Sequence, residues 1–219
     1  MLAPGEKYIE AYVKAGHNGQ INKIWKVYLE TQDSFMGSTM YGPPVDLSFK
    51  NITNLADTWA EEPNRGLRPI KRSPEMKYES RSLRLSYNII NDLHDLQMTV
   101  THFLAEPSQL AWLDLSFNRI LHITHVLCEL QELRVLYLHC NSISVLSEVD
   151  RLGVLPHLHT ITLHGNAIET NKTYRNHVIS ALPGLKTMDF SAVTRQEREL
   201  AKIWHDNKSR TRGRKETVQ

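Results

Sequence analysis

The feature that most constrains this chain is a repeat in which leucines and one asparagine keep fixed places. The pattern LxxLxLxxNxI occurs three times, at Leu110-Leu113-Leu115-Asn118-Ile120, Leu133-Leu136-Leu138-Asn141-Ile143 and Leu158-Ile161-Leu163-Asn166-Ile168. A weaker copy precedes these, Ser80-Leu83-Leu85-Asn88-Ile90, and a degenerate fifth copy follows, Leu185-Met188-Phe190. The asparagines are 30, 23 and 25 residues apart. Regular periods of this length indicate a solenoid in which each unit stacks on its neighbours.

Each letter of the pattern has a physical role. The LxL core of each copy predicts a short strand, because alternate side chains of a strand point to opposite faces. One repeat cannot bury its leucines alone, so adjacent repeats share a core. The asparagine turns the chain inward, where its amide can satisfy backbone groups at the bend. The longer first interval predicts a helix near Asp95–Leu104. The fold class is α/β, a solenoid of about five repeats.

A stack of strands has an open end that needs a cap. We expect the solenoid over residues 80–193, with a helix over Tyr174–Leu182. Thr194 and Glu197 fit a capping box, which starts a cap helix over residues 194–206. Its apolar face is predicted to be Leu200, Ile203 and Trp204.

Residues 1–79 do not follow the repeat. Within the arm of residues 1–42, Gln20–Thr31 predicts an amphipathic helix. Its apolar stripe consists of Ile21, Ile24, Trp25, Tyr28 and Leu29. This helix either packs on the solenoid as an N-terminal cap or docks on another protein. Residues 43–79 are punctuated by prolines and are expected to be extended, with at most short helices near Asn51–Ala60, and to be ordered by a partner.

The repeats with this cap resemble the short leucine-rich repeat class with a C-terminal cap. That class includes a phosphatase regulatory subunit, the A-prime protein of a spliceosomal particle and a leucine-rich axonemal dynein light chain. Four segments extend the resemblance to the leucine-rich repeat-containing protein 51 family: Pro43–Phe49 (PPVDLSF), Glu61–Ser73 (EEPNRGLRPIKRS), Leu113–Asn118 (LDLSFN) and Leu163–Asn166 (LHGN). The resemblance covers roughly residues 43–204. It implies a non-enzymatic protein-binding module that occurs in ciliated cells.

Strand alternation also predicts which side chains point away from the leucine core, onto the concave face of the sheet. Most of these positions are small and polar. The candidate partner-binding residues among them are Arg84, Trp112, Asp114, Tyr137, His139 and His164. Aromatic anchors in a concavity are typical of binding hot spots. The alternative is that the N-terminal arm partly covers these rings.

The positive charge is concentrated at the C-terminal end. Residues 195–219 hold 8 basic and 4 acidic side chains, whereas residues 81–194 carry a net charge of −2. The basic residues of the expected tail, residues 207–219, are Lys208, Arg210, Arg212, Arg214 and Lys215. Such an end either contacts an acidic partner, such as the tails of tubulin, or is simply solvated.

Catalytic and metal-binding patterns are weak. His122 and His125 form a lone HxxH, and two cysteines cannot build a zinc site. His139 and His164 should stand about 5 Å apart on adjacent strands, as a metal site, a pH-sensitive patch or a coincidence of the repeat. We expect no cofactor and no enzymatic activity. Without a signal sequence or an apolar span, a cytoplasmic location is expected.

The leading functional hypothesis is a non-enzymatic scaffold of the ciliary or flagellar axoneme that binds proteins through its concave face and both arms. The alternatives are a ribonucleoprotein-assembly subunit and a phosphatase regulator. Nucleic acid is a poor fit as a partner, because its binding requires many basic contacts and the repeats are net negative.

Overall fold

The computed structural model describes residues 38–66 and 69–216. Within these ranges the chain forms one seven-stranded sheet whose strands follow sequence order. Strands β1 to β6 are parallel, and β7 (Ser191–Ala192) pairs antiparallel with β6. The parallel strands are β1 (Val45–Asp46), β2 (Ser82–Arg84), β3 (Trp112–Asp114), β4 (Val135–Tyr137), β5 (Thr160–Thr162) and β6 (Thr187–Met188). The α/β repeat solenoid predicted from the leucine pattern is confirmed.

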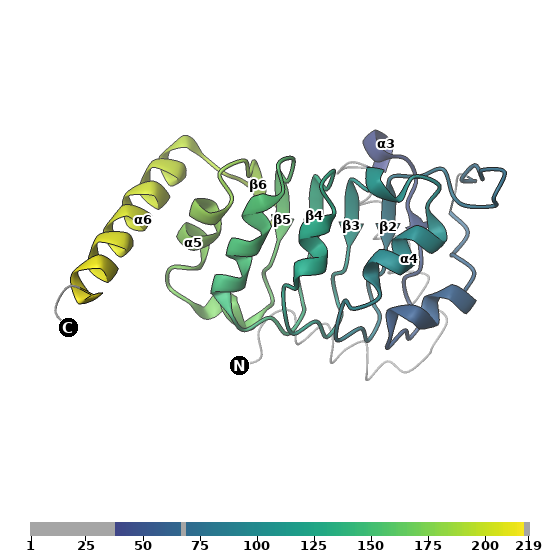
Figure 1. The fold of residues 1–219 in the computed structure, drawn as a ribbon, viewed down its shortest axis with the longest axis horizontal. Helices are drawn as coiled ribbons and strands as arrows, with labels where there is room; N and C mark the ends of the chain where they lie inside the picture. Colours follow the sequence, from purple (N-terminus) through teal and green to yellow (C-terminus); the bar gives the residue numbers. More distant parts are fainter. Residues whose placement is uncertain (1–37, 67–68, 217–219) are drawn as a thin grey trace.

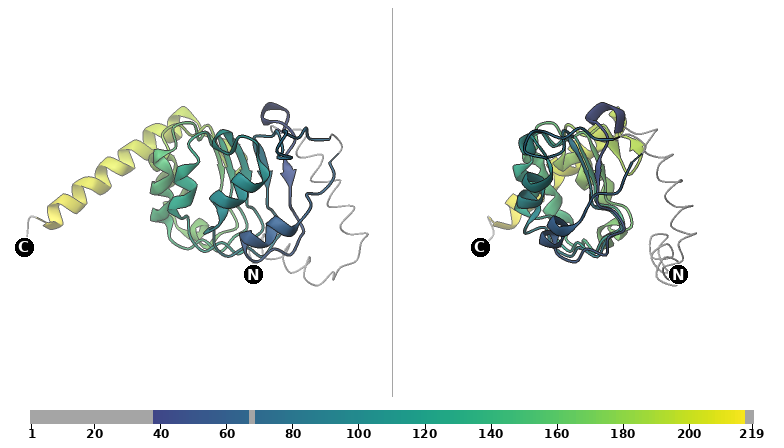
Figure 2. Two further views of the ribbon diagram at one scale, coloured as in Figure 1. Left: turned by 45° about the vertical axis from the view of Figure 1, so that its right-hand side comes forward. Right: turned by 90° about the vertical axis from the view of Figure 1, so that its right-hand side faces the viewer.

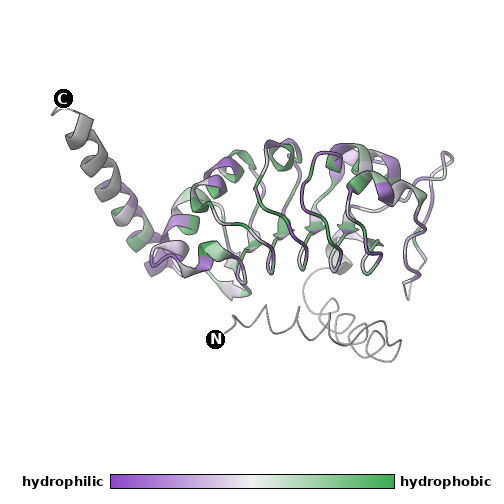
Figure 3. Cartoon of the chain, turned by 90° about the horizontal axis from the view of Figure 1, so that it is seen from below, coloured by the Kyte–Doolittle hydropathy of each residue, from purple (hydrophilic) through white to green (hydrophobic). Residues whose placement is uncertain are grey.

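The helical segments that return the chain between these strands pack on one side of the sheet, and the strands line the other (Figure 1, Figure 3). Most returns are short 3-10 helices: η1 (Leu55–Ala60), η2 (Pro107–Gln109), η3 (His125–Glu129), η4 (Leu146–Val154) and η5 (Ala167–Thr170). Two are α-helices, α4 (Leu96–Phe103) and α5 (Tyr174–Ala181). The leucines of the repeat, among them Leu83, Leu113 and Leu136, are fully buried between the two layers.

The asparagines join consecutive repeats. Asn118 Nδ2 donates to Leu85 O (3.0 Å) in the preceding repeat and to Leu115 O (3.1 Å) in its own. Its Oδ1 accepts from Ile90 N (3.1 Å). The same three kinds of bond recur at Asn88, Asn141 and Asn166. Each asparagine side chain therefore bonds backbone groups of two repeats. This asparagine ladder fixes how the repeats stack and also stabilises the turn after each strand.

The residue before each asparagine position has a left-handed backbone. Phe49, Tyr87, Phe117 and Cys140 have φ between 53° and 60°, and Gly165 has φ 72°. At Gly165 a side chain would also collide, since an added Cβ would lie 2.8 Å from Cys140 Sγ. Glycine therefore serves this turn for two reasons, conformation and space.

The solenoid begins earlier than the repeat pattern indicates. Val45 and Asp46 of β1 pair with Leu83 and Arg84 of β2, and Val45 and Leu47 are fully buried. Lys50 occupies the asparagine position of this first unit, and its amide donates to Asn88 Oδ1 at 2.9 Å. The prediction that residues 43–79 form an arm ordered only by a partner is therefore wrong for the part that contains β1 and η1. These residues supply one face of the core.

The C-terminal cap is confirmed, although its packing face differs from the predicted one. Helix α6 (Arg195–Glu216) starts at the predicted box, with Glu197 N donating to Thr194 Oγ1 (3.2 Å) and Thr194 N to Glu197 Oε2 (2.8 Å). Leu200 and Ile203, however, are 52% and 58% exposed. The buried residue is Ala201, because its small side chain permits close contact between α6 and α5.

Ion pairs and hydrogen bonds hold the base of α6 in place. Arg175 on α5 contacts Glu197 at 2.6 Å, and the Arg198 guanidinium donates to the carbonyls of Pro183 and Leu185. Trp204 is half-buried against His177, with ring centroids 5.7 Å apart. Beyond these contacts the helix leans away from the repeats and continues through the segment expected to be a separate tail (Figure 1, Figure 2).

Candidate protein-binding face

We use the term concave face for the side of the sheet opposite the leucine core. Three charged side chains cross it on neighbouring strands. Arg84 on β2 lies 3.6 Å from Asp46 on β1 and 3.6 Å from Asp114 on β3. All three groups occupy matching register positions, so the charges alternate along the sheet and carry a net charge of −1. Ionised carboxylates on both sides of a guanidinium satisfy its planar donors.

Two aromatic rings continue this row. The Arg84 guanidinium lies 5.4 Å from the Trp112 ring centroid, and Trp112 contacts Tyr137 edge to face at 5.7 Å. Trp112 and Tyr137 are only 4% and 8% exposed. With Tyr41, Ala111 and Val135 they form an apolar cluster separate from the leucine core. The rings therefore point away from the core, as strand alternation predicts, but they are packed rather than open to solvent.

A pair of histidines lies beyond Tyr137. His139 and His164 stack at 4.8 Å with an interplanar angle of 8°, close to the spacing expected for adjacent strands. Burial, together with the neighbouring His164, lowers the pKa of His139 to about 3, and Asp189 opposes this only in part. His139 is consequently neutral at physiological pH, and its Nδ1 lies 2.7 Å from Thr162 Oγ1. The lowered pKa argues against a charge change on the His139 ring at physiological pH, and the role of the His139–His164 pair stays a prediction.

Phe190 completes the row. Its ring lies 5.7 Å from Tyr137, 5.6 Å from His139 and 5.6 Å from His164. The fifth copy of the repeat predicts that this residue belongs to the core, and that prediction is wrong. Asp189 and Phe190 have φ of 49° and 60°, which turns the ring onto the concave face. Phe190 is 48% exposed, so the row ends in an accessible aromatic side chain.

Asp189 ties the histidine pair to the cap. Its Oδ1 accepts from Leu163 N (2.7 Å) and His164 N (3.0 Å), and its Oδ2 accepts from Tyr174 Oη (2.8 Å). Burial disfavours the charge, but the hydrogen bonds from His164, Leu163 and Tyr174 outweigh it and lower the pKa of Asp189. Burial and the same carboxylate raise the pKa of Tyr174. The carboxylate thereby accepts from the two backbone amides that follow β5, where the asparagine ladder ends.

The structure brings all six predicted concave-face residues into this one row. It also adds three that the repeat pattern misses, Tyr41, Asp46 and Phe190. A signal for Asp46 is present, because Val45–Lys50 (VDLSFK) parallels Leu113–Asn118 (LDLSFN). In both segments the aspartate Oδ1 accepts from the backbone amide (2.9 Å) and hydroxyl (2.6 Å) of the serine two residues later. We refer to the nine residues together as the concave row.

Two groups of predicted partner-binding residues lie beyond what the structure describes. The stripe of Ile21, Ile24, Trp25, Tyr28 and Leu29 lies outside the described residues. The basic residues Lys208, Arg210, Arg212, Arg214 and Lys215 lie on α6, but their side chains are likewise outside the described part. Both groups stay predictions.

Metal ligation receives no support from the geometry. Among the described residues, no three His, Cys, Asp or Glu side chains gather closely enough to hold a metal ion. His122 instead lies 3.1 Å from Glu148. Cys128 and Cys140 are free and buried, and burial raises the pKa of the Cys140 thiol to about 11. Over residues 38–66 and 69–216, no helix combines the length and apolar character that a membrane span requires.

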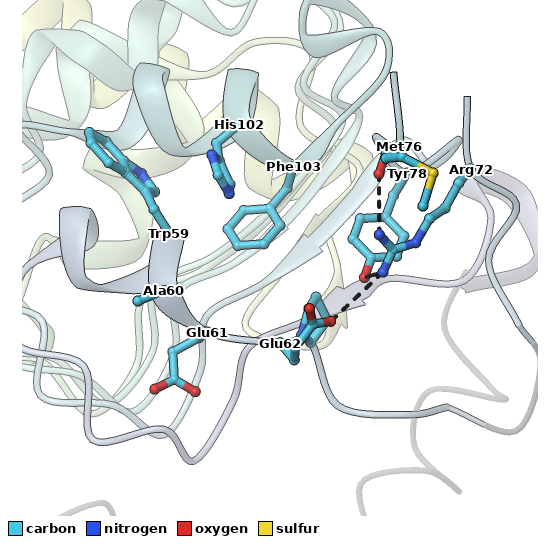
Figure 4. A pocket seen from close by; sticks show the side chains of 10 residues that line it. Trp59, Ala60, Glu61, Glu62, Arg72, Met76, Tyr78, His102 and Phe103 are labelled. Carbon is cyan, nitrogen blue, oxygen red and sulfur yellow. Dashed lines mark hydrogen bonds and ion pairs between the residues drawn. The ribbon is translucent and has the colours of Figure 1, made fainter. Parts of the chain in front are cut away.

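A small hollow of about 140 Å³ lies at the other end of the molecule, where η1 meets α4. Figure 4 shows Trp59 and His102 on one side and Arg72 and Tyr78 on the other. The Arg72 guanidinium lies over the Tyr78 ring at 4.4 Å and reaches Glu62 at 3.8 Å. The Arg72 guanidinium thus already occupies the face of the Tyr78 ring. The hollow is lined by both acidic and basic side chains, which favours no particular ligand.

The parallel strands, the asparagine ladder and the helical cap define a leucine-rich repeat protein, and the leucine-rich repeat family model matches residues 83–217. The chain is 46% identical to leucine-rich repeat-containing protein 51 of Rattus norvegicus over 170 residues, which cover 78% of this chain and 88% of the rat protein. The chain belongs to the leucine-rich repeat-containing protein 51 family. The resemblance noted in the sequence is thus confirmed.

More distant similarity extends to a small nuclear ribonucleoprotein. A probable U2 small nuclear ribonucleoprotein A' of Caenorhabditis elegans is 34% identical over 108 residues, 49% of this chain and 43% of that protein. Among solved structures, the Drosophila melanogaster SNF/U2A' complex aligns with a TM-score of 0.49 and 25% identity, covering 63% of this chain and 86% of that one. Leucine-rich repeat proteins are typically non-enzymatic interaction modules, and the matched families indicate no enzyme.

Proposed function

We propose that this protein is a non-enzymatic scaffold that binds a partner protein through its concave face. The observation that carries this proposal is the concave row itself, which runs without a break from Asp46 to Phe190. Arginine, tryptophan and tyrosine are the residue types enriched in binding hot spots, and the row contains all three. A module that binds proteins needs anchors of this kind on a rigid surface, and parallel strands supply the rigidity.

The accessible end of the row is where a partner first makes contact. Phe190 is 48% exposed and the His164 side chain 33% exposed. Phe190 contacts the buried ring of Tyr137 and the half-buried ring of His139, and His164 stacks on His139, so a partner side chain placed on them extends an existing aromatic cluster. Edge-to-face contacts of this type add to the free energy of simple area burial.

The finer part of the proposal is that the partner belongs to the ciliary or flagellar axoneme. Two features support it: the resemblance to a class that includes an axonemal light chain, and the excess of basic residues at positions 195–219. A basic helix extending from the body is suited to the acidic tails of tubulin, because opposite charge raises the rate of encounter. The concave face and α6 then contact different components of one assembly.

The second candidate function is assembly of a ribonucleoprotein particle. The 34% identity to the C. elegans U2 protein favours it, since that protein's name places it in such a particle. The charge of the repeats weighs against direct contact with RNA, because residues 81–194 carry a net charge of −2. A protein–protein role inside a particle remains compatible with the concave row.

Affinity purification of the tagged full-length chain from ciliated cells, followed by quantitative mass spectrometry, separates these functions. The proposal predicts enrichment of tubulin and axonemal proteins over an untagged control. Enrichment of spliceosomal proteins instead would establish the second function. Recovery of neither class would contradict both.

A further inference from the structure

The path of the chain into the first repeat shows what lies next to the concave face. Helix α3 (Ser38–Tyr41) precedes Gly42, whose φ of 83° reverses the chain toward β1. Before that turn, Tyr41 O accepts from Arg81 N at 3.2 Å and from Ser82 Oγ at 3.3 Å, at the start of β2. Before it enters β1, the chain therefore passes the start of β2 and does not come from the outer edge of β1.

The Tyr41 side chain extends further along the same face. Its hydroxyl lies 3.4 Å from His159 Nε2, next to β5, and its ring packs with Trp112 and Tyr137. The Tyr41 hydroxyl and the His159 ring thus meet between β2 and β5, at the end where the strands begin. Helix α3, which ends at Tyr41, consequently lies next to the start of β2.

The burial of the concave row is the second observation. Trp112 and Tyr137 retain 4% and 8% exposure although they face away from the leucine core. Among the described residues, Tyr41, Arg84 and Phe190 contact these two rings from the concave side. Apolar surface of this kind is buried in the native state because its exposure to water is unfavourable.

From these observations we infer that the concave row is a docking surface for the chain's own amphipathic segment, Gln20–Thr31. Its stripe of Ile21, Ile24, Trp25, Tyr28 and Leu29 places five apolar residues at helical spacing. Twelve residues in a helix span about 18 Å, and four strand spacings, from β1 to β5, span about 19 Å. The six residues between the segment and helix α3, residues 32–37, can extend about 20 Å, which is about the length of the segment itself.

Charge is compatible with this occupant. The segment contains Lys23, Lys26 and Glu30, for a net charge of +1. The carboxylates of Asp46 and Asp114 give the row a net charge of −1. The functional consequence, which rests on the proposed function, is that an external partner must displace the segment before it can bind the concave row.

Fluorescence of a single tryptophan tests the docking without any partner. In the full-length chain Trp25, Trp59 and Trp204 are replaced by phenylalanine, so that Trp112 alone reports. Acrylamide quenching is then compared between this parent, a variant with Ile21→Asp and Ile24→Asp, and a control with Lys23→Gln and Lys26→Gln. Both variants change the net charge by −2, but only the first disrupts the apolar stripe.

We expect Trp112 to be weakly quenched in the parent and the control, and severalfold more strongly quenched in the stripe variant. Thermal melts check that the solenoid stays folded in all three. Equal quenching in the parent and the stripe variant would overturn the inference, whether the common value is low or high. A similar rise in the control would also overturn it, because charge rather than apolar contact would then be responsible. Since no partner is present, neither result bears on whether partners use the concave face.

Discussion

The asparagine side chains act as the joints of this molecule. The carbonyls that accept from Asn118 Nδ2 each have a second donor. Leu85 O also accepts from Asn88, and Leu115 O also accepts from Asn141. The amide of Ile90, by contrast, has Asn118 Oδ1 as its partner at 3.1 Å. Loss of the side chain would therefore leave one buried donor without an acceptor.

We predict that Asn118→Ala lowers the free energy of unfolding by about 2 kcal/mol, the cost of one orphaned buried amide and its lost hydrogen bonds. Chemical denaturation measures the change. Asn91→Ala is the control, since that side chain is exposed in the loop before the next repeat. Equal stability of the two variants would show that the ladder is not needed for stacking.

Asp189 makes the stability of the last strands depend on pH. Because its folded pKa is lower than the ordinary value of 3.8, the ionised carboxylate stabilises the fold above pH 3.8. That contribution is lost as the pH falls from 3.8 through the folded pKa. We predict that Asp189→Asn melts below the parent at pH 7, and that the gap narrows once the pH falls below about 4.

Thermal melts across this pH range test the prediction, with Asp206→Asn as a control that removes an exposed carboxylate from α6. A gap that stays constant down to acid pH would mean that the charge of Asp189 does not stabilise the last strand. A gap that widens would mean that its folded pKa is raised rather than lowered.

At the scale of single elements, prediction from the sequence succeeds where alternation decides and fails where backbone conformation or side-chain size decides. Strand alternation places Arg84, Trp112 and Tyr137 on the concave face, as observed. It cannot locate Phe190, because two consecutive left-handed residues reverse the side expected for that ring. The first repeat is not detected in the sequence because Lys50 occupies the asparagine position. The backbone amide of Lys50 nevertheless donates to the side-chain oxygen of Asn88, which links the first two repeats.

The cap helix shows the effect of side-chain size. A hydrophobicity pattern favours Leu200 and Ile203 as the buried face, yet close approach of α5 and α6 selects the smaller Ala201. We predict that Ala201→Glu destabilises the protein by about 3 kcal/mol, because it places a charge in a tightly packed contact. Leu200→Glu, one residue away and already half exposed, should change stability little.

Urea denaturation of these two neighbouring variants compares the faces directly. If Leu200→Glu were the more destabilising of the two, the face predicted from the sequence would be the true one. The observed packing would then be contradicted at this helix.

At the scale of the whole molecule, the solenoid presents two unlike surfaces from one rigid frame. The concave face gathers aromatic and charged side chains in register, whereas the opposite face consists of short helices with scattered exposed residues such as Val154, which is 59% exposed. This asymmetry follows from the repeat, since every unit places equivalent positions on the same side. The identity of the residues at those positions, rather than the fold, gives the concave face its binding character.

Binding of partners to the concave face is tested most directly by comparing two matched variants. Full-length chains carrying Phe190→Glu or Val154→Glu are used as baits in ciliated cells beside the parent, and partner recovery is quantified by mass spectrometry. Both variants place a carboxylate at an exposed apolar position, so folding should be equally preserved, and melting temperatures verify this. We expect Phe190→Glu to lose most of the partners recovered by the parent and Val154→Glu to retain them. Full recovery with Phe190→Glu, or loss confined to Val154→Glu, would contradict the account.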